Sequence, residues 1–172
     1  MTDELDDVVV VGAGPAGLSI AWALKSLGIP PRVLERTAAV GDVWRNHYEG
    51  LTLNTGRSFS RLAGDPLPAS AGRWPKRDDM VRLLSSYPER GRFSVETGVD
   101  VVRVRLNEIT RQWDLECRDH PPIRARIVVL AVDMSRVPII PRWPGLETFR
   151  GPVMLRRQPV PISCGTFCPW AI

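Results

Sequence analysis

The chain has 172 residues, of which 44% are hydrophobic and 24% charged, and its formal net charge is +4. This composition is typical of a globular protein, and the length allows one domain with a sizeable core. No stretch approaches the roughly 18 consecutive apolar residues of a membrane span. The arginines are scattered among acidic residues, which argues against a nucleic-acid-binding face.

The N-terminus and the cysteines bear on location and on metal binding. Residues 1–7 are acidic where a secretory signal peptide would be basic, so we expect the protein in the cytoplasm. The cysteines and histidines are not spaced as metal ligands, and we predict no metal site. These residues are His47, Cys117, His120, Cys164 and Cys168. We interpret Cys117 as a core thiol and the two histidines as surface or loop residues.

The N-terminal segment has the pattern of a strand, a glycine-rich turn, a helix and a second strand. Residues 8–11 are consecutive valines, as expected for a strand buried on both faces of a parallel sheet. After the turn, apolar residues at helical spacing extend to residue 27, and Gly28 is a natural stop for the helix. Residues 32–35 then form the second strand. Together these elements predict one βαβ unit.

The rest of the chain predicts a long connection, a second helix and an antiparallel excursion. Residues 37–75 have no clear periodicity, but their interspersed aromatic residues favour an ordered loop. Residues 77–87 have the apolar stripe and the acidic first turn of a helix. Residues 99–106 and 112–117 alternate as antiparallel strands, whereas residues 123–132 begin with alternation and end as the apolar run of a buried parallel strand.

The glycine-rich turn carries the chemical prediction. Gly12 permits the tight turn, Gly14 lets a diphosphate approach the backbone, and Gly17 lets the helix pack against the strand. The helix N-terminus offers free N–H groups to the phosphates. Glu35 is placed to accept hydrogen bonds from a ribose, and its charge would repel a 2′-phosphate, so the site should prefer FAD or NAD over NADP. The alternative is a glycine-rich turn in an ordinary α/β protein.

Several segments in chain order resemble one family of enzymes. They are residues 9–18, 33–36, 41–44, 48–55, 74–79, 127–131, 137–145 and 149–151. Over roughly residues 6–151, the chain resembles the flavin-containing monooxygenases, a family that includes the YUCCA-like enzymes and the Baeyer–Villiger monooxygenases. The resemblance implies an α/β fold with a Rossmann-like, FAD-binding parallel sheet and a small antiparallel excursion.

The resemblance also implies cofactor-binding residues, although no catalytic residue. Those for the ADP half of FAD are Gly12, Gly14, Pro15, Ala16, Gly17, Glu35 and Arg36. Those in the segment that passes close to the flavin are Gly41, Trp44 and Arg45. For Trp44 the alternative is a packed aromatic side chain. In the family, NADPH reduces the flavin, and the flavin then uses O₂ to oxygenate a nitrogen, a sulfur or a carbonyl carbon of a small molecule.

The chain departs from the family in three ways. Asp133 stands where the family has glycine, and its side chain and charge would weaken phosphate binding nearby. Residues 152–172 have no regular period, and we hypothesise a frameshift near Leu155. The predicted domains are therefore an FAD-binding domain at residues 1–151 and an irregular tail. No second glycine-rich motif follows, which predicts an incomplete FAD domain and no NADPH-binding domain.

Three functions therefore remain open. The first is the FAD-binding part of a flavin-dependent, NAD(P)H-using monooxygenase that is truncated and incomplete as an enzyme. The second is an NAD-dependent dehydrogenase domain, which the long aromatic-bearing loop and the antiparallel excursion disfavour. The third is a non-catalytic nucleotide-binding fragment or pseudoenzyme, which Asp133 and the missing second domain favour. We expect no nucleic-acid or membrane partner, and pairing with a separate C-terminal chain stays open.

Overall fold

The computed structural model of the chain describes residues 5–133, 143–146, 148–151, 154–155 and 158–159. It divides the chain into two units, Met1–Val132 and Asp133–Ile172, and each is described by itself. In the second unit, strands β7 (Met154–Leu155) and β8 (Gln158–Pro159) pair antiparallel. The two tail cysteines and most of the segment with the hypothesised frameshift lie outside the described residues. The domain boundary at residue 151 stays a prediction.

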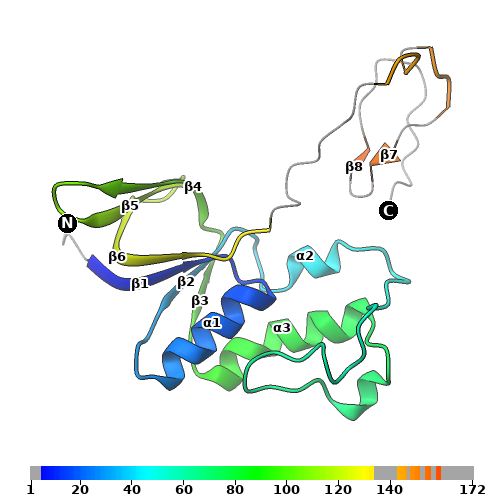
Figure 1. Cartoon of the computed structure of the whole chain (residues 1–172), viewed down its shortest axis with the longest axis horizontal. Helices are drawn as coiled ribbons and strands as arrows, with labels where there is room; N and C mark the ends of the chain where they lie inside the picture. The colour runs from blue at the N-terminus through cyan, green and yellow to red at the C-terminus, as the bar shows by residue number, and fades with distance from the viewer. Residues whose placement is uncertain (1–4, 134–142, 147, 152–153, 156–157, 160–172) are drawn as a thin grey trace. The chain divides into compact units, whose positions relative to one another are not determined.

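The first unit is built on a six-stranded mixed sheet in the order β3-β2-β1-β6-β5-β4 (Figure 1). The strands are β1 (Leu5–Val11), β2 (Arg32–Glu35), β3 (Val95–Thr97), β4 (Asp100–Asn107), β5 (Gln112–Arg118) and β6 (Ile123–Leu130). β1 pairs in parallel with both β2 and β6, and β2 pairs in parallel with β3. β5 pairs antiparallel with β4 and with β6. The predicted α/β fold with an antiparallel excursion is therefore confirmed.

Helix α1 (Pro15–Ser26) follows β1 directly, and the sequence explains both of its ends. Pro15 occupies the first helical turn, where its missing N–H costs no intrahelical bond. At the other end, Gly28 has a φ of 77°, a left-handed conformation that glycine adopts without strain. The N–H of Ile29 then bonds the carbonyl of Leu24 at 2.9 Å, as in a Schellman motif. The predicted stop at Gly28 is confirmed.

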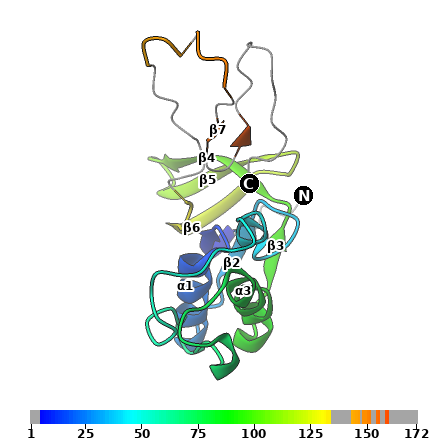
Figure 2. The same ribbon diagram turned by 90° about the vertical axis from the view of Figure 1, so that its right-hand side faces the viewer.

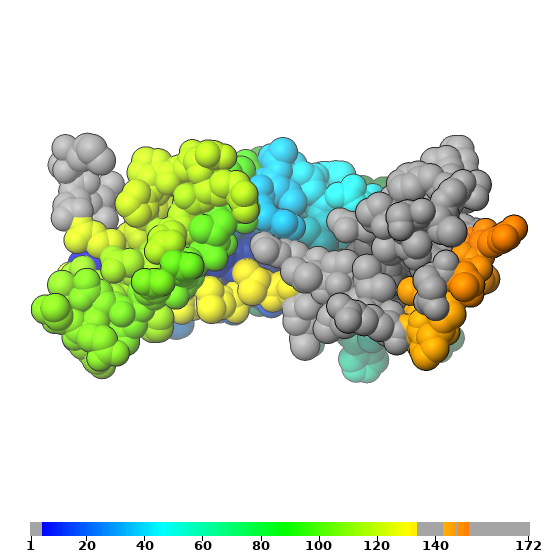
Figure 3. All heavy atoms as spheres, turned by 90° about the horizontal axis from the view of Figure 1, so that it is seen from above, coloured from blue at the N-terminus to red at the C-terminus, as the bar shows by residue number. Residues whose placement is uncertain are grey.

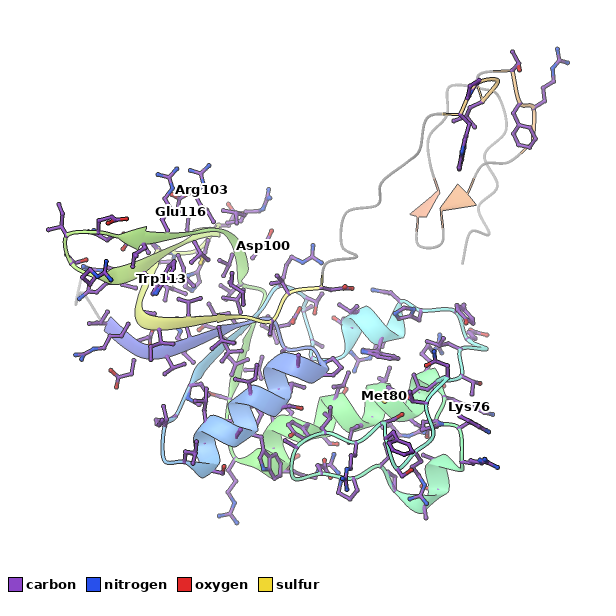
Figure 4. All side chains as sticks on the ribbon, in the orientation of Figure 1. Lys76, Met80, Asp100, Arg103, Trp113 and Glu116 are labelled. Carbon is purple, nitrogen blue, oxygen red and sulfur yellow. The ribbon has the colours of Figure 1, made fainter. Side chains whose placement is uncertain are left out.

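Helix α3 (Arg77–Gly91) extends beyond the predicted end at residue 87. Lys76 and Met80 mark its N-terminal end (Figure 4), where the backbone N–H of Lys76 donates to Asp79 Oδ2 at 2.8 Å. The buried residues of the predicted stripe are Met80, Leu83, Leu84 and Tyr87. Pro88 removes one backbone hydrogen bond but does not end the helix, because packing of this stripe outweighs the loss.

Hydrophobic side chains fill both faces of the sheet. Figure 2 shows α1 and α3 on one side of the parallel strands β1 and β2, and the antiparallel strands β4 and β5 of the same curved sheet on their other side. The first cluster, on the helix side, consists of Val10, Ala13, Leu18, Ala21, Val33, Leu62, Leu67, Ala71, Met80, Leu83, Leu84 and Tyr87. The second cluster, under the antiparallel strands, consists of Val9, Val11, Leu34, Val99, Leu115, Ile123 and Ala125. Successive valines of β1 alternate between the clusters, so this strand is buried on both faces as predicted.

The antiparallel strands have one apolar and one polar side. Trp113 on β5 is half-buried against the second cluster. Arg103 on β4 and Glu116 on β5 are exposed and face each other, with 3.7 Å between a guanidinium nitrogen of Arg103 and a carboxylate oxygen of Glu116 (Figure 4). Such an exposed pair contributes little to stability. The alternation predicted for these strands therefore separates the buried side from the solvated side.

The long connection between β2 and α3 is ordered, as its aromatic residues predicted. It contains helix α2 (Asp42–Arg45) and the short 3-10 helix η1 (Ala69–Ala71). Leu67 is buried in the first cluster. The hydroxyl of Tyr87 on α3 donates to the carbonyl of Ala63 in the connection. These contacts anchor the connection to the helix layer.

Two strands differ from their prediction. β3 is a short parallel strand beside β2 that was not predicted separately, because three residues carry too little periodicity. β6 is parallel to β1 as predicted, but its apolar end is only partly buried: Val128 and Val129 pack against the two clusters, and their neighbours are exposed. Ile127 is 54% exposed and Leu130 is 61% exposed, and Figure 3 shows β6 atoms at the surface. Beyond Ala125, β6 has a paired strand on one side only within the described part of the chain.

The uncovered end of β6 predicts self-association at high protein concentration. Residues 127–132 are uncharged and apolar, and an open strand edge of this kind pairs with other chains. We expect Ile127→Lys to shift the average mass toward the monomer in sedimentation equilibrium, with less than about 0.5 kcal/mol change in the free energy of unfolding. Ile109→Lys adds the same charge at a 94% exposed turn residue. Equal effects of the two substitutions would contradict the prediction.

Arg32 on β2 ties three strands together. Its guanidinium lies 3.0 Å from a carboxylate oxygen of Asp6 on β1 and 2.8 Å from one of Glu96 on β3. Glu96 also lies 3.3 Å from the Nε2 atom of His120, a loop residue as predicted. Burial by itself would lower the pKa of Arg32, but hydrogen bonds with the two carboxylates raise it overall. The guanidinium therefore stays charged between its partners.

We expect Arg32→Met to lower the free energy of unfolding by about 1–2 kcal/mol, because two partly buried carboxylates lose their shared donor. Urea denaturation followed by circular dichroism measures the change. Arg105→Met removes the same charge at an exposed position of β4 and serves as the control. If the two variants unfold at the same urea concentration, the ion pairs of Arg32 do not stabilise the sheet.

Candidate functional site

The glycine-rich turn joins β1 to α1 and contacts the chain just beyond β6. Gly12 has a φ of 103°, a conformation that residues with side chains rarely adopt, and its N–H bonds the carbonyl of Leu34 at 2.8 Å. A Cβ at Gly12 would lie 2.6 Å from the carbonyl oxygen of Ala131. Both the turn and the neighbouring chain therefore require glycine at this position.

Gly14 and Gly17 differ in what surrounds them. A Cβ at Gly17 would lie 1.9 Å from the carbonyl oxygen of Gly12, so only glycine lets α1 pack this closely against the turn. A Cβ at Gly14 would meet no atom within 4 Å. The first N–H groups of α1 have no acceptor within the helix, and they carry the positive end of its dipole. The turn therefore has an open side where an anion can approach backbone N–H groups.

Glu35, the last residue of β2, points to the same turn. The residue is only 9% exposed, and its Oε2 accepts a 2.8 Å hydrogen bond from the backbone N–H of Ala13. Its Oε1 accepts two bonds from Thr37, one from the backbone N–H at 2.9 Å and one from the hydroxyl at 2.8 Å. The predicted sequence of strand, turn, helix and strand is confirmed, and the Glu35 carboxylate lies at the mouth of the turn.

The other residues predicted to bind the ADP half lie next to these. Pro15 and Ala16 form the first positions of α1, half-buried and exposed respectively. Arg36 is exposed and directly follows Glu35. The chain thus brings this predicted set to the junction of β1, α1 and β2, where a dinucleotide could contact it. Their contact with a cofactor stays a prediction.

The three residues predicted near the flavin lie at α2. Gly41 precedes this helix with a φ of 87°, and a Cβ there would lie 3.3 Å from Ser85 Oγ on α3. Arg45 donates to Ser85 Oγ at 2.9 Å and to the carbonyl of Val40 at 3.1 Å. Trp44 is half-buried against the first cluster. Each residue therefore has a structural role at α2, and contact with a flavin stays a prediction.

Ala13 and Thr37 at the mouth of the turn were not singled out by sequence analysis. Ala13 acts through its backbone N–H, which leaves no signal in the side chain. Thr37 stands two residues after the acidic residue, and a hydroxyl at that spacing can bond back to a neighbouring carboxylate or backbone group. This spacing is the one signal that could have drawn attention to Thr37.

The remaining polar candidates have structural surroundings. Cys117 is half-buried against the second cluster, and burial raises the pKa of its thiol, as fits a core thiol. Among the residues that the structure describes, no three His, Cys, Asp or Glu side chains gather as metal ligands. No helix in the described ranges has the length and apolarity to cross a membrane.

Comparison with known proteins identifies the family. Residues 9–153 match the family model described as pyridine nucleotide-disulphide oxidoreductase. The chain belongs to this family. The matched residues run from β1 past β6 and include the glycine-rich turn, Glu35 and α2.

The curated relatives that the chain matches include monooxygenases. The chain is 29% identical over 147 residues to indole-3-pyruvate monooxygenase YUCCA1 of Oryza sativa subsp. japonica, covering 85% of this chain and 36% of the relative. It is 34% identical over 153 residues to the FAD-binding monooxygenase lolF1 of Epichloe uncinata, covering 86% and 28%. These relatives confirm the resemblance to flavin-dependent monooxygenases. The chain spans about a third of their length.

A solved structure supports the same family. The flavin-containing monooxygenase from Stenotrophomonas maltophilia superposes with a TM-score of 0.79 at 30% sequence identity. The superposition covers 86% of this chain and 44% of that protein. The Rossmann-like fold is therefore confirmed, and the chain corresponds to a part of such a monooxygenase.

Proposed function

We propose that this chain is the FAD-binding part of a flavin-dependent, NAD(P)H-using monooxygenase, with the ADP half of FAD at the turn between β1 and α1. The observation that carries the proposal is the open side of Gly14 beside the Glu35 carboxylate. The N–H groups at the start of α1 would hold the diphosphate, and Glu35 would hold a ribose hydroxyl. The family and the named relatives support the flavin chemistry.

The residues present fit an ADP group. Gly14 has no Cβ, and the space that a Cβ would occupy is open, so a phosphate oxygen can reach the backbone there. Glu35 Oε2 accepts one hydrogen bond from Ala13, and a carboxylate oxygen can accept a second. A 2′-phosphate would meet the negative charge of Glu35, which favours FAD or NAD over NADP at this site.

The chemistry of the whole protein is a wider proposal. FAD, when bound, supplies the redox and oxygen chemistry of such an enzyme. A small-molecule substrate and NADPH are proposed from the likeness to monooxygenases, and no residue is assigned to either. The cytoplasmic location stays a prediction.

Binding measurements on the purified chain test the proposed function. We expect the chain to show flavin absorption or to bind added FAD in calorimetry, with ADP competing for the same site. Glu35→Gln should weaken the binding of FAD and of ADP by about tenfold. The substitution alters the proposed acceptor for the ribose hydroxyl and the acceptor of the two hydrogen bonds from Thr37. Glu108→Gln, at an exposed turn residue, is the matched control.

The alternatives give different outcomes in the same experiment. Binding of NAD without FAD would support the dehydrogenase domain. Binding of neither FAD nor NAD would support the non-catalytic fragment and contradict the proposed function. FAD binding that ADP does not displace, and that Glu35→Gln leaves unchanged, would place the cofactor elsewhere on the chain.

A further inference from the structure

Thr37 holds the Glu35 carboxylate with two donors. Its backbone N–H lies 2.9 Å and its hydroxyl 2.8 Å from Glu35 Oε1. The hydroxyl also lies 3.0 Å from the carbonyl of Ala39, and its single proton has these two acceptors to choose between. The ionised carboxylate is the stronger acceptor, so the proton is directed to Glu35.

The hydrogen bonds leave a defined part of the carboxylate free. Each carboxylate oxygen can accept about two hydrogen bonds. Both positions on Glu35 Oε1 are taken by Thr37, and one on Oε2 is taken by the backbone N–H of Ala13. The remaining position is on Oε2, the oxygen that faces the glycine-rich turn. Rotation of the carboxylate would break the bonds to Thr37.

Thr37 is itself held by the edge of the sheet. Its carbonyl accepts a 3.0 Å bond from the N–H of Gly98, directly after β3. The carbonyl of Glu35 accepts a 3.0 Å bond from the N–H of Val99. The position of Thr37 therefore depends on main-chain bonds, and its hydroxyl is free to orient the carboxylate.

We infer that Thr37 is a positioning residue for the dinucleotide: it fixes the Glu35 carboxylate so that Oε2 faces a ribose hydroxyl. The inference rests on the proposed function, in which Glu35 binds the ribose of an ADP group. Thr37 itself need not touch the ligand. The hydroxyl of Thr37, and not only its backbone, then contributes to affinity.

Measurements of nucleotide affinity show whether Thr37 positions Glu35 for the ligand or only supports the fold. We expect Thr37→Val, which keeps the shape and loses the hydroxyl, to weaken ADP by about tenfold in calorimetry. Thr37→Ser should stay within about twofold of the unsubstituted chain, since it keeps the hydroxyl. Thr110→Val, at an exposed turn residue, is the matched control. The proposed effect acts through a ribose hydroxyl, which 2′,3′-dideoxy-ADP lacks. Thr37→Val should therefore weaken the binding of this nucleotide by less than about twofold.

Several results would overturn the inference. One is that Thr37→Val lowers the affinity for ADP and for the dideoxy nucleotide equally. Another is that Thr37→Ser lowers the affinity for ADP as much as Thr37→Val does. A third is that Thr37→Val leaves the affinity for ADP unchanged. Equal losses for both nucleotides would mean that Thr37 only supports the fold.

A measurement without ligand keeps this inference distinct from the proposed function. Glu35 Oε2 protects the amide of Ala13, so Thr37→Val should speed hydrogen exchange of that amide by about tenfold in nuclear magnetic resonance spectra. The amides of Val9 and Val10 in the centre of β1 should not change. If the unsubstituted chain binds no nucleotide, the proposed function fails, while the exchange rates still decide whether Thr37 orients Glu35. Unchanged exchange of Ala13 would overturn that role.

Discussion

Gly17→Ala is expected to destabilise the fold strongly. A Cβ at this position would lie 1.9 Å from the carbonyl oxygen of Gly12. No side-chain rotation relieves this contact, because the backbone fixes the position of the Cβ and the oxygen is itself a backbone atom. Helix α1 would have to move away from the turn and from the first cluster, which contains Leu18 and Ala21. We expect a loss of at least about 3 kcal/mol in the free energy of unfolding, a large share of the roughly 5–15 kcal/mol of a typical domain.

Urea unfolding measured by circular dichroism tests this expectation. Gly50→Ala is the matched control, because a Cβ at Gly50 meets no atom within 4 Å and its φ is not left-handed. The control should unfold at nearly the urea concentration of the unsubstituted chain. Should Gly17→Ala do the same, the close contact between α1 and the turn is not present in solution.

Gly14→Ala, in contrast to Gly17→Ala, is expected to leave the chain folded and to lower its nucleotide affinity strongly. A Cβ at Gly14 meets no atom of the chain within 4 Å, and the φ of this residue is −77°, which alanine adopts freely. Alanine is less favourable than glycine at the N-cap of a helix, so we expect a loss of about 1 kcal/mol in the free energy of unfolding. The added methyl group would occupy the space proposed for the diphosphate, and we expect ADP and FAD to bind about 10–100-fold more weakly.

Calorimetry with ADP and FAD, together with urea unfolding of the same samples, checks both halves of this expectation. Gly50→Ala again serves as the control and should bind as the unsubstituted chain does. A Gly14→Ala chain that is folded and binds ADP with unchanged affinity would show that the diphosphate does not lie against this backbone. Together, Gly14→Ala and Gly17→Ala separate the ligand-binding glycine from the packing glycine within one motif.

Local chemistry made the N-terminal half of the fold predictable. Four consecutive valines, a turn that needs glycine and a helix that ends at Gly28 each restrict the backbone within a few residues. The antiparallel excursion was predictable for the same reason, since alternation along residues 112–117 sets which side chains face the second cluster. The position of Glu35 at the mouth of the turn follows from parallel strands ending at one edge of the sheet.

Other features depended on contacts between distant segments. Pro88 lies inside α3 because buried residues on the neighbouring turns hold the helix. Arg45 donates to Ser85, a residue 40 positions away, and no spacing in the sequence indicates this pair. The exposed end of β6 has the same apolar residues as the buried β1, because burial depends on which elements cover a strand and not on the strand itself.

Local patterns in the sequence were enough to predict the order of the elements, the glycines of the turn and the acidic residue that follows, because each is required by backbone conformation or by the short range of a hydrogen bond. Which glycine meets a backbone atom and which faces open space depends instead on how the elements pack. The tertiary structure also shows that Glu35 is held by Thr37 and Ala13 at the turn. These properties arise where β1, β2 and α1 converge, and a distance across that junction is not encoded in any local pattern.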